Sequence, residues 1–147
     1  MTKTKLHITA IIALLSLIVT SCGLSGGGNK KEINPTNIYG KWQEGTNFER
    51  YYADSIEYVL QNDSTIKVVG TTWDEADDMT EQDALPFNWT LNDNNLLQTH
   101  INFNGTVTPK TYTVTELTAN VFVYHDDHGV EHSFTKVKEP IIEQEEQ

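Results

Sequence analysis

Apolar and polar residues alternate along most of the chain from Tyr39 onward, in short segments rich in valine, threonine and aromatic residues. The alternation is clearest where polar residues separate Phe87, Trp89 and Leu91. A period of two residues is typical of β-strands with one buried face. The pattern predicts strands over residues 39–44, 49–52, 56–60, 65–73, 87–91, 96–103, 107–115, 121–125 and 130–138, and no long helix.

Residues that favour tight turns separate the predicted strands. Asn62-Asp63, Asp93-Asn94, Asn104-Gly105 and His128-Gly129 tolerate positive φ or cap their own backbone. Consecutive hairpins form an antiparallel up-and-down meander, and a meander of about eight strands loses its exposed edges by closing into a barrel. We therefore predict an all-β fold, a small closed barrel. Residues 74–84 interrupt the alternation of strands and tight turns, and they are expected to form one short helix or acidic loop across one end of the barrel.

The first residues are unlike the rest of the chain. Lys3 and Lys5 precede an apolar run from Ile8 to Val19. About twelve apolar residues are too few for a membrane-spanning helix, which needs roughly twenty, so they predict a secretory signal peptide. Val19-Thr20-Ser21-Cys22, with the only cysteine of the chain, resembles the lipobox of bacterial lipoproteins. The alternative is an ordinary signal peptide followed by a chance cysteine.

The lipobox resemblance implies that residues 1–21 are removed and that Cys22 carries acyl chains such as palmitate, which anchor the protein to a membrane. Residues 22–37 are expected to form the lipidated cysteine and a flexible tether, because residues 23–35 are rich in glycine and polar residues, and a tether of that length would hold the domain roughly 20 Å from the bilayer. The barrel domain is expected over residues 38–138, followed by an acidic tail, 139–147. The expected location is the cell envelope, at the outer membrane in preference to the inner membrane, on either its periplasmic or its surface face.

Charge and cysteine content exclude several classes of function. The formal net charge is −11, and loss of residues 1–21 removes two lysines, so that eight basic and 21 acidic residues leave −13. A protein this acidic does not bind nucleic acid through phosphate contacts. A single cysteine excludes an internal disulfide and a multi-cysteine zinc site, and no cofactor is expected.

Several segments resemble a known family. Tyr39-Gly40-Lys41-Trp42 is similar to the glycine-x-tryptophan signature of lipocalins, in which the tryptophan packs at the closed base of an eight-stranded barrel. Residues 73–78, 87–91, 112–117 and 123–129 are similar to segments of lipocalin-like lipoproteins of Gram-negative gut bacteria. The resemblance covers roughly residues 38–137. It implies a fold and a compartment, but no particular ligand.

Two groups of residues have the chemistry of metal ligands. His125, Asp126, Asp127, His128 and His132 suit zinc, but side chains around a hairpin turn splay apart, so a solvated acidic turn is the preferred interpretation. The acids at positions 74, 75, 77, 78, 81 and 83 suit calcium, but they lack the glycine and the ligand spacing of an EF-hand. No metal site is predicted.

Enzymatic signatures are missing from the sequence, which predicts a protein that is not an enzyme. It has no glycine-x-serine-x-glycine elbow, no phosphate-binding glycine loop and no histidine-glutamate-x-x-histidine motif. The cysteine is assigned to lipid, which excludes thiol catalysis. His100 alternates with Gln98 and Asn102, and we expect it on the polar surface of its strand.

Aromatic residues are abundant enough to suggest ligand binding as well as core packing. Eight-stranded barrels either fill their interior with side chains or hold one small ligand. We expect a non-catalytic binding site for a small apolar or amphipathic ligand, with candidate residues Tyr58, Trp73, Trp89, Tyr112 and Tyr124. The alternative is an interaction module with a filled barrel, whose acidic loops contact an envelope protein or a glycan. An apolar pocket above roughly 300 Å³ favours the first interpretation.

Two short motifs suggest a covalent modification. Asp54-Ser55-Ile56 and Asp63-Ser64-Thr65 resemble the O-glycosylation sites of exported proteins in such bacteria. Both are expected at turns, where a bulky polar group stays in water, so Ser55 and Ser64 are candidate glycosylation sites. Turn propensity alone also explains an aspartate followed by a serine at these places.

Overall fold

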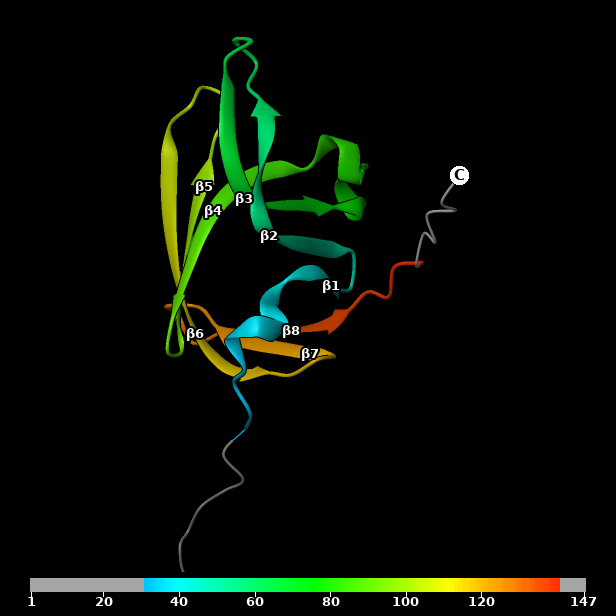
Figure 1. Ribbon diagram of the computed structural model, residues 1–147, viewed down its shortest axis with the longest axis vertical. Helices are drawn as coiled ribbons and strands as arrows, with labels where there is room; N and C mark the ends of the chain where they lie inside the picture. Colours follow the sequence, from blue (N-terminus) through cyan, green and yellow to red (C-terminus); the bar gives the residue numbers. More distant parts are fainter. Residues whose placement is uncertain (1–30, 141–147) are drawn as a thin grey trace, which may run out of the picture. The chain divides into compact units, whose positions relative to one another are not determined.

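A computed structural model describes residues 31–140, which form a closed barrel of eight antiparallel strands (Figure 1). Each strand pairs with the next along the chain, and β8 pairs with β1, so the predicted all-β meander is confirmed. The strands are β1 (Gly40–Glu44), β2 (Asn47–Val59), β3 (Thr65–Asp74), β4 (Leu85–Asn92), β5 (Asn95–Ile101), β6 (Val107–Leu117), β7 (Val121–His125) and β8 (Glu131–Lys136). Three short 3-10 turns accompany them: η1 (Pro35–Ile38), η2 (Glu75–Asp77) and η3 (Glu81–Asp83).

Strand β2 differs from the sequence prediction, because residues 49–52 and 56–60 belong to one strand and not to two. Tyr51 pairs with Gly70 and Ile56 pairs with Val68, so residues 52–55 lie opposite a single residue of β3. Extra residues of this kind form a bulge, which bends a strand without ending it. The bulge accounts for the turn-like composition of Asp54 and Ser55.

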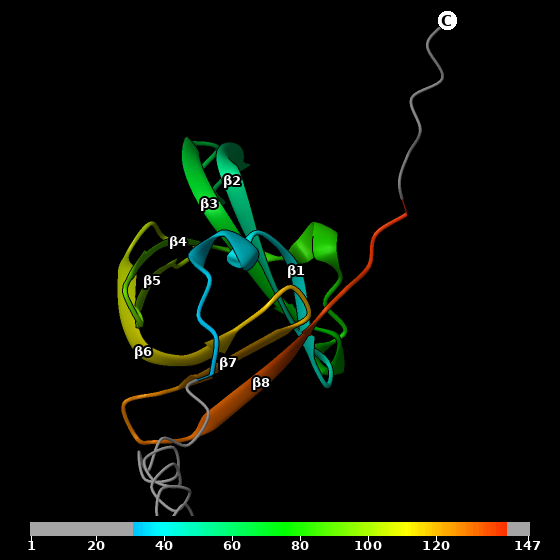
Figure 2. The same ribbon diagram turned by 60° about the horizontal axis from the view of Figure 1, so that its bottom comes forward.

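The segment before β1 closes one end of the barrel. Ile33 forms a parallel bridge with Leu117, and the Asn34 side chain accepts a hydrogen bond from Thr36 N at the start of η1. Figure 2 shows η1 lying across this end. Residues 32–37 were expected to belong to a flexible tether, and this prediction is wrong for them, because backbone pairing and burial of Ile38 fix the segment.

Large apolar side chains fill the half of the barrel next to η1. Trp42 is fully buried, donates from Nε1 to the Ile38 carbonyl at 2.7 Å and packs against Phe122 with ring centroids 5.4 Å apart. This tryptophan therefore anchors the end of the barrel that η1 covers. The buried core around it consists of Ile38, Tyr51, Phe87, Leu96, Val114, Leu117, Phe122, Tyr124 and Phe134.

The acidic stretch between β3 and β4 packs on the outside of the barrel, and not across its end as expected. Side chains alternate along a strand, so Phe48 and Trp73 point away from the face that carries Glu49 and Thr72. Phe48 and Trp73 stack with centroids 5.0 Å apart, and Ala84 packs against them. These apolar contacts fix the segment between β3 and β4 on the outer face of the barrel.

The predicted signal peptide, Cys22 and the end of the acidic tail lie outside the described residues. Within residues 31–140, no helix combines the length and the apolar character that crossing a membrane requires.

Candidate ligand-binding site

A pocket of about 370 Å³ opens into the barrel at the end away from η1. All eight strands contribute to it, which identifies it as the interior of the barrel and not as a surface groove. Its lining consists of Glu44, Asn47, Glu49, Thr72, Leu85, Gln98, His100, Lys110, Tyr112, Tyr124, His132 and Phe134. An adjoining hollow of about 620 Å³ shares Lys110, Tyr112 and His132 with it and extends to Asp126 and Asp127 in the β7–β8 turn. The pocket is therefore mixed in character, with polar and aromatic groups side by side.

A buried carboxylate lies among the side chains at the base of this pocket. Glu49, on β2, is only 7% exposed. Its two carboxylate oxygens accept hydrogen bonds from the hydroxyls of Tyr51, at 2.5 Å, and Tyr124, at 2.8 Å. Gln98 Nε2 lies 3.3 and 3.4 Å from the same oxygens. Three strands thus direct hydrogen-bond donors at one carboxylate.

The hydrogen bonds continue from Glu49 to His100 on β5. Gln98 Nε2 donates to the Tyr51 hydroxyl at 2.7 Å, and Gln98 Oε1 lies 2.8 Å from His100 Nε2. Because the amide oxygen can only accept, His100 Nε2 carries the proton of the neutral ring. The donors then run in one direction, from His100 through Gln98 and Tyr51 to Glu49. Glu49 is therefore the final acceptor in this series of hydrogen bonds.

The expected surface position of His100 is wrong. Gln98 and His100 share the inward face of β5 with Leu96, and Gln98 and Leu96 are fully buried. The residue alternation was interpreted as a polar outer face, whereas the polar residues point into the barrel opening. The sequence did contain evidence for an inward position, because Leu96, Gln98 and His100 are spaced two residues apart and therefore share one face of the strand.

Burial shifts the pKa values of the ionisable residues in this network. Burial, together with the nearby Lys110 ammonium, lowers the pKa of His100 to about 4. Burial also raises the pKa of Glu49, although the hydrogen bonds from Tyr51, Tyr124 and Gln98 favour its ionised form. The pKa values of Tyr51 and Tyr124 are raised by burial and by the Glu49 charge, so both hydroxyls keep their protons at neutral pH.

The histidines of the β7–β8 region point in different directions. His125 pairs with Glu131 at 3.0 Å, and His128 approaches Asp127 at 3.5 Å on the surface. His132 contacts Glu44 at 3.1 Å on the rim of the pocket. In the described part of the chain, no three histidine, cysteine or carboxylate side chains are placed to hold a metal ion.

The acids between β3 and β4 serve the local backbone and the outer face. Asp74 accepts from Ala76 N at 2.8 Å, and Asp83 accepts from Thr80 N at 3.1 Å. Glu81 pairs with Lys41 at 2.9 Å and with Arg50 at 2.7 Å. Glu139, at the start of the predicted tail, also pairs with Arg50.

The structure brings together two of the five aromatic residues predicted to bind ligand. Tyr112 and Tyr124 line the pocket, with ring centroids 4.5 Å apart. Trp73 lies in the cluster on the outer face, and Trp89 packs against the core with Nε1 donating to Val69 O at 2.8 Å. Tyr58 lies beyond the β2 bulge, paired with Ile66. Glu49, Gln98 and His100, which complete the site, were not predicted as ligand-binding residues.

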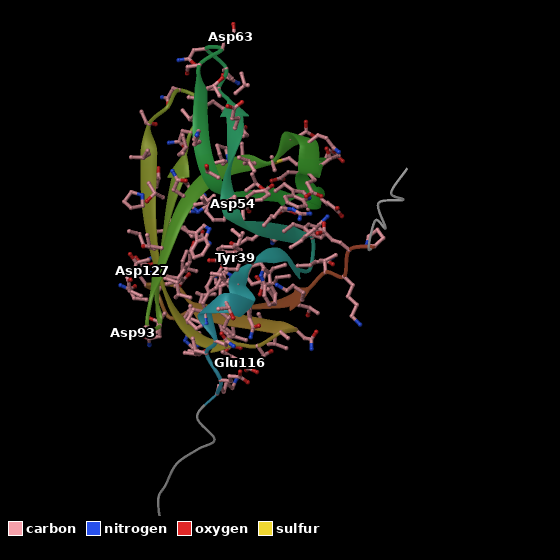
Figure 3. The ribbon with its side chains drawn as sticks, in the orientation of Figure 1. Tyr39, Asp54, Asp63, Asp93, Glu116 and Asp127 are labelled. Atoms are coloured by element: carbon pink, nitrogen blue, oxygen red, sulfur yellow. The ribbon has the colours of Figure 1, made fainter. Side chains whose placement is uncertain are left out.

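The two candidate glycosylation serines lie on the β2–β3 hairpin and are exposed. Figure 3 shows Asp63 at the hairpin tip and Asp54 lower on the same hairpin. Ser64 follows the tip, and its hydroxyl donates to Asn62 Oδ1. Ser55 lies in the β2 bulge and not in the turn that was expected.

The fold and the site together define an eight-stranded antiparallel barrel with one filled end and one polar opening. Comparisons of this chain with protein-family models, with curated proteins and with solved structures find no match.

Proposed function

We propose that this protein is a lipid-anchored protein of the bacterial cell envelope whose barrel binds a small amphipathic ligand without chemical conversion. The observation that carries the binding proposal is the pocket of about 370 Å³ to which every strand contributes. Its volume exceeds the roughly 300 Å³ at which small-molecule sites begin. Its lining combines Leu85, Tyr112 and Phe134 with buried polar groups, which suits a ligand with an apolar body and a polar head.

The ionisation of the site supports binding without catalysis. A general acid or base works best when its pKa lies near the operating pH. The pKa of His100 lies at about 4, and the raised pKa values of Tyr51 and Tyr124 keep those hydroxyls protonated. Near neutral pH these three residues therefore offer a ligand donors and acceptors of fixed protonation.

The position of the pocket agrees with membrane anchoring. Residues 32–34 pair with Leu117 at the filled end, and the pocket lies at the opposite end. If Cys22 carries the lipid, the anchor is attached through the end of the barrel that lies opposite the pocket.

The binding proposal is tested by native mass spectrometry of the full protein, purified from its own bacterium in mild detergent. We expect a retained small molecule. Leu85→Trp fills the pocket and should abolish retention, whereas Val59→Trp adds the same side chain at a position that is 61% exposed and should leave it intact. An empty barrel, together with no saturable binding of a fluorescent amphiphile, contradicts the proposal and favours the interaction module.

The anchoring proposal has its own test. Cys22→Ser removes the only cysteine of the chain, so the variant should lose the acyl mass and move from the membrane fraction to the soluble fraction. Unchanged mass and unchanged fractionation would show that the lipobox resemblance is misleading.

A further inference from the structure

We infer that the barrel pocket selects an organic cation, a small ammonium compound with an apolar body. The inference rests on the proposed binding function and adds the charge class of the ligand. Three features of the pocket support it: an unpaired buried carboxylate, a wall of aromatic rings, and an excess of acid around the opening.

The first feature is Glu49, which is 7% exposed and has no ionic partner. The ion pairs among residues 31–140 involve other carboxylates, and the contacts of Glu49 are neutral hydroxyl and amide groups. A buried charge is costly unless an opposite charge accompanies it. The hydrogen bonds from Tyr51, Tyr124 and Gln98 favour the ionised carboxylate, but burial outweighs them and raises the pKa of Glu49, because no opposite charge accompanies the carboxylate. A cation in the pocket would supply the missing countercharge.

The second feature is the aromatic wall beside Glu49. The Tyr124 ring lies 4.5 Å from Tyr112, 5.4 Å from Phe134 and 5.3 Å from His132, measured between centroids. The faces of aromatic rings attract cations, and the attraction grows when water is excluded. Tyr124 itself is buried, so an ammonium group in the pocket would meet the partly exposed rings of Tyr112 and His132, close to the carboxylate to which Tyr124 donates.

The third feature is the balance of charge around the opening. Glu44, Asp126 and Asp127 contribute three carboxylates at the opening, and an ionised Glu49 adds a fourth, against the single ammonium of Lys110. His100 is neutral near pH 7, because burial lowers its pKa to about 4. This excess of negative charge attracts cations and repels anions such as fatty-acid carboxylates.

The donor set distinguishes an organic cation from a metal ion. Divalent metals need several carboxylate, histidine or cysteine ligands around one point, and residues 31–140 contain no such group. Around Glu49 the neighbours are phenol hydroxyls and an amide, which already hold both carboxylate oxygens. Long-range attraction and partly exposed rings remain available, and these suit an ammonium group carried on an apolar body.

The test compares three ligands of similar size by isothermal titration calorimetry: 2-phenylethylamine, 2-phenylethanol and 3-phenylpropionate. We expect the amine to bind the full protein at least about tenfold more tightly than the alcohol, and the carboxylate to bind most weakly. Glu49→Gln should reduce the preference for the amine to less than about twofold, with binding of the alcohol unchanged. Glu57→Gln, on an exposed part of the same strand, is the matched control and should keep the preference.

A second variant keeps the inference testable if Glu49→Gln does not fold. Lys110→Gln removes the only lysine at the opening and should tighten amine binding by about two- to fivefold. Equal affinities for amine and alcohol, or tightest binding of the carboxylate, would overturn the inference but leave the proposed binding function standing. If none of the three ligands binds, the inference is also wrong. The proposed function fails with it only if the purified protein carries no small molecule.

Discussion

Trp42 illustrates how one residue holds the closed end of the barrel. It is fully buried, and its indole contacts three separate parts of the chain: the carbonyl of Ile38, the ring of Phe122 and the ammonium of Lys136, which lies 4.1 Å from its centroid. A smaller side chain would leave part of this space empty and would remove the indole donor from the Ile38 carbonyl. Trp42 is therefore expected to contribute strongly to the stability of this end.

Trp42→Ala should lower the free energy of unfolding by roughly 3 to 5 kcal/mol, the usual cost of emptying a large aromatic site. Trp42→Phe should cost less, because a ring remains and only the indole hydrogen bond and part of the volume are lost. Urea denaturation followed by circular dichroism measures both. A loss below 1 kcal/mol for the alanine variant would contradict the structural role assigned to Trp42.

His100 should make stability depend on pH. Its pKa is about 4 in the folded protein and about 6.5 in the unfolded chain, so the unfolded chain takes up the proton first. The stability that this residue contributes is present above pH 6.5 and is lost as the pH falls toward 4. His100→Gln keeps a donor for Gln98 and cannot titrate. Relative to this variant, the wild-type protein should lose about 1 to 2 kcal/mol over that range, because partial exposure reduces the effect.

Glu49 has the opposite effect on the pH dependence of folding stability over part of the same pH range. Its folded pKa is raised, so its contribution to stability is greatest at low pH and declines as the pH rises through that pKa. Because Glu49 is present in both proteins, the difference between wild type and His100→Gln isolates the histidine. Parallel stability curves from pH 7 to about 4 would show that His100 is not protonated on unfolding.

At the scale of the elements, the β3–β4 pair is held by an unusually close contact. Gly70 pairs with Phe87, and a Cβ atom at position 70 would lie 2.3 Å from Phe87 Cε2. Phe87 is fully buried, so its ring has little room to move away. Only three residue pairs join β3 to β4, and one of them depends on this glycine.

Gly70→Ala should therefore destabilise the protein by about 1 to 3 kcal/mol, the usual range for overpacking a core. Phe87→Leu makes space at the same contact, so the double variant should lose less stability than the sum of the two single variants. Thermal and urea unfolding of the four proteins measure this coupling. Additive losses would mean that the clash is relieved elsewhere.

Turns were predicted well because their chemistry is local. Asp63, Asp93, Gly105 and Gly129 all have positive φ, as expected from the turn motifs that contain them. The β2 bulge was not predicted, because Asp54 and Ser55 have the same composition in a bulge as in a turn. Pairing with β3 decides between the two, and that pairing depends on residues far along the chain.

At the scale of the whole molecule, the barrel closes along a short seam. Only two residue pairs join β1 to β8, whereas seven join β5 to β6. Side chains extend the seam: Glu44 accepts from Ser133 N at 2.6 Å, and Lys136 Nζ donates to the Asn37 carbonyl at 3.0 Å. Glu44 also contacts His132, so the seam borders the ligand pocket.

Glu44→Ala should loosen this seam and speed hydrogen exchange at the Ser133 amide and its β8 neighbours, with a stability loss of about 1 to 2 kcal/mol. Amides of β4 and β5 should be unaffected, and Glu57→Ala on the exposed face of β2 is the control. Unchanged exchange at Ser133 would show that the backbone ladder alone closes the barrel.

The sequence by itself determined most of the strands and turns and the meander order, because alternation and turn propensity act between residues close along the chain. The expectations for Cys22, Ser55 and Ser64 also rest on sequence motifs alone. Tertiary structure decided which face of each strand is inward at the barrel opening. Burial normally favours apolar residues, so Gln98 and His100 were assigned outward, but closure places them beside Glu49, Tyr51 and Tyr124, where each polar group finds a partner. Burial of these polar groups is stable only because β2, β5 and β7 bring their hydrogen-bond partners together, and the sequence of a single strand does not reveal those partners.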